Sequence, residues 1–175
     1  MELIDYSIKW CESEIYTAKW LTAVGVVGLI VAIAFWKWGT IETARAIVLP
    51  LVAMSVLQIG IAVGTTYTNR QRIDDFREAY QDSPERFLQS EKERVAAFMP
   101  NYTVALVLGG VMLVAGFLGF ALFKAPIWRA IALMCIYFTL TLFTLDYFTR
   151  EHADIYQQQL ESLSDIDLSM PWVKK

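Results

Sequence analysis

The chain has 175 residues, of which 56% are apolar and 19% are charged, and its formal net charge is −3. Soluble domains usually carry about 25% charged residues, so this composition argues against a soluble globular domain. The small negative net charge does not indicate a class of partner, and we expect no nucleic-acid partner.

Four stretches of about 20 residues carry almost no charge, and Asp146 is the single ionisable residue within them. A hydrocarbon core about 30 Å thick requires helices of this length, and a soluble bundle would need polar faces that these stretches lack. They predict spans near residues 20–36, 47–67, 102–123 and 127–148. The first span follows a polar, acid-containing segment and is expected to stay as an anchor rather than to be cleaved. We therefore predict an all-α polytopic membrane protein, an antiparallel bundle of four transmembrane helices with helical cytoplasmic extensions.

The charge distribution predicts the orientation of these spans. An even number of spans places both termini on one side, and that side carries eleven of the fifteen basic residues. This excess favours both termini in the cytoplasm. The compact chain without organelle signals suggests a bacterial inner membrane. We expect five side chains to contact lipid headgroups at the inner interface: Trp20, Tyr67, Tyr147, Arg70 and Arg150.

Polar extensions of the spans are predicted to form a helical cytoplasmic head from residues 2–19, 68–82, 84–99 and 149–164. In the first extension, Ile4, Ile8, Cys11 and Ile15 recur at helical spacing and are expected to face inward. Before the third, Ser83 suits a helix cap and is followed by Pro84. Pro100 should bend or break the helix where it enters the membrane. Residues 1–164 are thus expected to form one domain, followed by a flexible tail at 165–175.

Two stretches 80 residues apart leave their spans in the same way. The matched pairs are Tyr67 with Tyr147, Arg70 with Arg150, Asp74 with Asp154, and Phe76 with Tyr156. In each stretch the aspartate lies one turn after the arginine and can pair with it. Two explanations stay open: a duplicated two-helix hairpin, or interfacial preferences that select the same residues twice.

Polar residues inside the spans are the default functional candidates of a membrane protein. Gln58 is expected to bond to another helix, with Ser55 one turn before it, and the alternative is that both line a pore. Asp146 is expected to form a helix-end ion pair with Arg150, and the alternative is a proton or cation site. The glycine spacing at residues 60–64 supports close helix packing.

No catalytic, metal or nucleotide motif occurs in the sequence, and we expect no cofactor and no metal. Cys11 and Cys135 lie at different predicted depths, which argues against a disulfide or a redox pair. Whether the protein is an enzyme stays open, although a non-catalytic role is favoured. An enzyme would have to gather residues at the inner interface from this set: His152, Glu151, Asp146, Arg150 and Cys11.

The preferred functional hypothesis is a small, non-catalytic membrane protein that acts as an adaptor, regulator or immunity-type partner through its head. The connections on the other side, near residues 37–45 and 124–129, are too short for a folded domain. Membrane lipids and a cytoplasmic protein are the expected partners, with four ring-bearing residues as the predicted contact: Phe76, Tyr80, Phe87 and Phe98. The alternatives are an oligomeric channel or carrier for a small solute or ion, with homo-oligomers formed through glycine faces, and a membrane-embedded enzyme at the inner interface.

Overall fold

The computed structural model describes residues 3–165, with side chains placed up to residue 162. Its long helices are α1 (Leu3–Trp38), α3 (Val48–Asp82), α4 (Pro84–Leu122) and α5 (Pro126–Asp165), and a short α2 (Glu42–Ala46) links the first two. All four long helices are long and apolar enough to cross a membrane. Residues 3–165 contain no strand, so the predicted all-α membrane bundle with helical extensions is confirmed. Of the predicted tail, residues 166–175 lie outside the described part of the chain.

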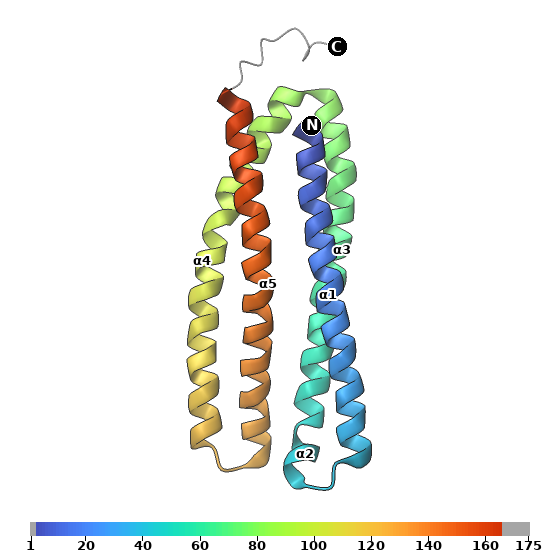
Figure 1. Ribbon diagram of the computed structural model, residues 1–175, viewed down its shortest axis with the longest axis vertical. Coiled ribbons are helices and arrows are strands. Elements are labelled where there is room, and N and C mark those ends of the chain that lie inside the picture. The colour runs from blue at the N-terminus through green and yellow to red at the C-terminus, as the bar shows by residue number, and fades with distance from the viewer. Residues whose placement is uncertain (1–2, 166–175) are drawn as a thin grey trace.

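The long helices form two antiparallel hairpins that stand side by side (Figure 1). Within each hairpin, α1 packs along α3 and α4 packs along α5, whereas the contacts between the hairpins are fewer and run mainly from α1 to α5. We call the end that carries the N-terminus the head, made of residues 3–19, 68–99 and 149–162. There α4 leans across to meet α3, so that all four helices converge (Figure 1).

Close packing inside each hairpin depends on a glycine of one helix that lies against an isoleucine of the other helix. A Cβ built on Gly25 would lie 2.7 Å from Ile59 Cγ1, and one built on Gly116 would lie 2.7 Å from Ile136 Cγ1. Gly60 and Gly64, whose spacing suggested packing, have nothing within 4 Å of such a Cβ. Their pattern therefore faces outward and makes no contact with the other helices that the structure describes.

The turn from α3 to α4 follows the predicted chemistry. Ser83 is the cap of α4, its hydroxyl accepts the Arg86 N–H at 3.4 Å, and Pro84 opens the helix. Of the two outcomes expected at Pro100, a bend or a break, the break does not occur, because α4 continues through it to Leu122. Proline removes one backbone bond, and packing of Phe98 and Met99 on the head core holds the helix on the side before Pro100.

The glycine contact yields a stability prediction. Gly25→Leu should lower the free energy of unfolding of the detergent-solubilised protein by roughly 1–3 kcal/mol, because the new side chain overlaps Ile59 and the Ser55 carbonyl. Thermal unfolding measures this change. Gly60→Leu is the matched control on the outward face and should change stability by less than about 0.5 kcal/mol. Equal losses in both variants would contradict the packing described above.

Candidate functional site

Aromatic side chains from all four long helices fill the head. Trp10 of α1 stacks on Phe98 of α4 and on Tyr156 of α5, with ring centroids 5.7 Å and 5.6 Å apart. Phe76 of α3 meets Phe87 of α4 edge to face at 5.3 Å. Four further buried residues complete this cluster: Cys11, Leu88, Val95 and Leu160. The head is therefore a packed core in its own right.

A chain of polar contacts runs through this core. Glu91 is only 3% exposed, and its carboxylate accepts the Tyr156 hydroxyl at 2.7 Å. The Ser7 hydroxyl lies 2.7 Å from the same tyrosine oxygen. Arg94, one turn after Glu91, donates from Nε to Glu91 Oε1 at 2.8 Å and from a terminal nitrogen to Oε2. Both oxygens of the buried carboxylate are thus paired, as a buried charge requires.

The Arg94 guanidinium also lies over three rings of the core. Its carbon is 4.7 Å from the ring centroid of Trp10, 5.4 Å from that of Phe76 and 5.5 Å from that of Phe98. Burial opposes the charge on Arg94, but the hydrogen-bonded Glu91 carboxylate outweighs it and raises the pKa of the guanidinium. The network therefore holds a complete ion pair on α4, and its contacts with Tyr156, Trp10 and Phe76 connect that pair to α5, α1 and α3.

The four rings predicted to contact a partner face the core of the head. Phe76 and Phe87 are 6% and 2% exposed, and the half-buried Tyr80 and Phe98 pack against the same core. The physical reason is that the ring-bearing faces of α3 and α4 turn toward each other and toward α1. Partner binding by the head stays a prediction, but its contacts would have to come from other side chains.

Of the five residues proposed for an enzyme, Asp146 and Arg150 line one hollow between α4 and α5. Cys11 is fully buried, and desolvation raises the pKa of its thiol to about 12, which keeps it from acting as a thiolate nucleophile. His152 is exposed on α5, and no hydrogen bond joins it to Cys11. Among the described residues, no group of three or more His, Cys, Asp or Glu is placed to hold a metal ion.

Gln58 and Ser55 are both fully buried on the inner face of α3. The predicted bond from Gln58 to another helix is absent, because neither of its amide atoms nor the Ser55 hydroxyl has a partner among the described residues. Thr139 and Thr141 return their hydroxyl bonds to their own helix, at 2.8 Å and 2.9 Å, as residues of this type do. Gln58 and Ser55 are therefore unpaired polar groups within the spanning part.

Asp146 does not form the expected ion pair with Arg150. In the described part of the chain Arg150 instead lies 3.9 Å from Asp154, one turn farther along α5, as the repeat analysis predicted for these two residues. In the first stretch the corresponding aspartate, Asp74, pairs with Arg77 at 3.5 Å. Asp146 is only partly buried, near the end of its span that adjoins the head.

The acid that sequence reasoning missed is Glu14, at the boundary between head and membrane. Its Oε1 is buried without a hydrogen-bond partner. Burial raises the pKa of this carboxyl to about 7, Arg72 of α3 opposes that rise, and the negative charge of Asp146 adds to it. At this boundary, charged groups from three helices thus act on one another: Glu14 of α1, Arg72 of α3 and Asp146 of α5.

The spacing of α1 contains a signal for Glu14. The buried positions Ser7, Cys11, Ala18 and Leu21 recur at three, four or seven residues, and Glu14 falls on the same face. The isoleucines chosen to mark the inward face, at positions 4, 8 and 15, are only half-buried. The face of α1 predicted from its most apolar side chains therefore differs from the face that is buried in the structure.

The predicted lipid-contact residues lie on the surface. Trp20, Tyr67 and Tyr147 are all more than half exposed, and Arg70 and Arg150 are exposed as well. Headgroup contact itself stays a prediction. The two similar stretches also share burial, since the tyrosines face outward while Phe76 and Tyr156 both enter the head core.

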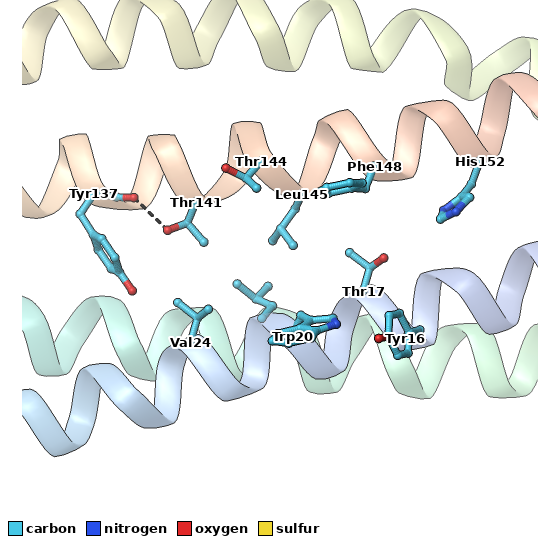
Figure 2. A pocket seen from close by; sticks show the side chains of 11 residues that line it. Tyr16, Thr17, Trp20, Val24, Tyr137, Thr141, Thr144, Leu145, Phe148 and His152 are labelled. Carbon is cyan, nitrogen blue, oxygen red and sulfur yellow. Dashed lines mark hydrogen bonds between the residues drawn. The ribbon is translucent and has the colours of Figure 1, made fainter.

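A groove runs between α1 and α5 where the hairpins meet (Figure 2). It has a volume of about 610 Å³, and eleven residues line it: Tyr16, Thr17, Trp20, Leu21, Val24, Tyr137, Thr141, Thr144, Leu145, Phe148 and His152. His152 lies at one end of it in Figure 2. A second hollow of about 260 Å³ adjoins it in the head and shares His152.

No protein-family model, no curated protein and no solved structure matches the chain.

Glu14 makes the stability of the fold depend on pH. Its carboxyl ionises near pH 4.5 in the unfolded chain and near pH 7 in the folded protein, so the folded state holds the proton longer. The free energy of unfolding should therefore fall as the pH rises from about 4.5 to about 7, and this contribution should be constant above that window. Glu14→Gln should remove that part of the fall, as measured by thermal unfolding in one detergent across the range.

The control is Glu12→Gln, an exposed acid on the same helix. It should keep the pH dependence of the parent protein. An unchanged slope in Glu14→Gln would contradict the burial of this carboxyl.

Proposed function

We propose that the protein is a non-catalytic membrane adaptor or regulator, of which an immunity-type protein is one form, that binds a protein partner through the surface of its head. Its location would be a bacterial inner membrane with both termini in the cytoplasm. The eleven basic residues on the head side, against four at the other end, support this orientation.

The observation that carries the proposal is the construction of the head. A bundle that only anchors itself in lipid has no need of a second core beyond the membrane. Here each long helix continues past its span, and together the extensions bury an aromatic cluster around the Glu91–Arg94 pair. Such a core holds the outer surface of the head in a fixed shape, which favours specific protein recognition.

The surface that this core supports carries mixed charge on α3 and α4. The Arg77 and Arg86 side chains are 58% and 86% exposed, and each lies near an acid of the same segment, Asp74 and Asp82. Exposed ion pairs of this kind add little stability, so they are free to exchange partners at an interface. At the opposite end the connections comprise only residues 39–47 and 123–125, which offer little surface.

Charge reversal on the head tests the proposal. A photoreactive residue placed at Gln89 should crosslink a partner protein to the head in native membranes. The double variant Arg77→Glu/Arg86→Glu should lower the yield of this crosslinked species by at least about fivefold. The measurement is the yield of the crosslinked species, with the attachment site mapped on the partner by mass spectrometry.

Arg45→Glu, at the opposite end of the bundle, is the control and should leave that yield unchanged. A yield that is equal in all three proteins, or no crosslinked protein at all, would contradict the proposal.

One observation favours a second candidate, a channel or carrier. Gln58 and Ser55 place unpartnered polar atoms inside the spanning part, where pore-lining groups would be found. We rank this candidate lower because the layer between them and the head is apolar, made of Ala18, Leu21 and Ala62.

Gln58→Leu separates the two functions. For an adaptor, removing two unsatisfied buried polar atoms should raise the free energy of unfolding by about 1–3 kcal/mol and leave partner crosslinking intact. Ion or solute flux into vesicles that contain the parent protein should be absent. Flux that the parent protein supports and Gln58→Leu abolishes would favour the channel instead.

A further inference from the structure

The lining of the seam between α1 and α5 changes from apolar to polar along its length. Toward the membrane interior it is the groove of about 610 Å³, and toward the head it is the hollow of about 260 Å³. The two share His152 and are lined by successive turns of the same two helices. They therefore form one elongated site with an apolar part and a polar part.

The apolar part has the dimensions and lining of a chain-binding site. On α5 it extends from Tyr137 to Phe148, twelve residues over which the helix rises about 16 Å. Trp20 and Phe148 along it are 58% and 50% exposed, so the groove opens on the surface that faces lipid. Sites of this volume with mostly apolar and aromatic walls and few polar groups are typical of ligand-binding pockets.

The polar part has the charge of an anion site. Lys9 lines it together with polar groups of His152 and Gln159, and none of the eight residues around it carries a carboxylate. Trp10 also lines this part, is more than nine-tenths buried, and has an indole N–H without an acceptor among the described residues. An anionic oxygen here would meet a cation and hydrogen-bond donors.

We propose that the α1–α5 seam binds one anionic phospholipid of the surrounding membrane. One acyl chain lies in the apolar groove, and the phosphate lies in the polar hollow beside Lys9 and His152. The arrangement fits a phospholipid because most of the apolar part lies within the predicted spans. The polar part begins at His152, one turn beyond the span that ends near residue 148, where a phosphate group would lie. This inference is independent of the proposed protein partner, since it concerns a different surface.

The test uses the full-length protein in a mild detergent. Native mass spectrometry would follow the titration of phosphatidylglycerol and, separately, of phosphatidylcholine with the same acyl chains. The parent protein should retain one phosphatidylglycerol per chain and bind phosphatidylcholine at least about fivefold more weakly. Lys9→Gln should weaken phosphatidylglycerol binding by about fivefold, the effect of one lysine at a lipid surface.

Two matched controls distinguish the site from general attraction to lipid. Lys19→Gln removes another exposed lysine of α1 that does not line the seam, and it should change binding by less than about twofold. Thr141→Trp fills the groove and should abolish retention of the lipid, whereas Leu140→Trp, on the adjacent exposed position, should not. Thermal unfolding of each variant establishes that it is folded.

The proposal is overturned if Lys9→Gln and Lys19→Gln have equal effects, or if folded Thr141→Trp retains the lipid like the parent protein. Equal binding of phosphatidylcholine and phosphatidylglycerol would also overturn it, because the headgroup would then not be recognised by charge.

Discussion

The pairing of Glu91 with Arg94 inside the aromatic core is the interaction on which the head depends. Both residues belong to α4, but their charges are tolerable away from water only because other helices complete their surroundings. Tyr156 of α5 supplies a hydrogen bond to the carboxylate, and Trp10 of α1 supplies a ring face to the guanidinium. The polar network therefore ties the ends of the helices together more specifically than apolar contacts alone would do.

The helices are thus attached to one another at the head, and outside the head their packing depends on other contacts. In the membrane there is no hydrophobic drive between helices, so association depends on close approach of small residues. Gly25 provides it within the first hairpin and Gly116 within the second. Between the hairpins, α1 and α5 instead carry bulky side chains such as Trp20 and Phe148, and the seam between them stays open as a groove. The head is therefore closed by its polar and aromatic network, whereas the seam is open because bulky side chains line it.

The interior of the bundle is also graded in polarity. Glu14 lies just below the head core, an apolar layer follows, and Gln58 lies deeper with Ser55. Each of these groups has an unpartnered atom, which costs stability in a medium without water. These positions therefore depart from what packing alone would select, and departures of that kind concentrate at functional sites.

The sequence by itself determined the four long helices, their membrane character and the Ser83 cap, because these follow from length, hydropathy and local backbone chemistry. Only the tertiary structure decided which face of each extension is buried. That choice turned the rings of Phe76 and Phe87 inward, placed Glu14 in the interior and formed the α1–α5 seam. The physical reason is that periodicity defines a face of a helix but not its neighbour, and burial is a property of the pair.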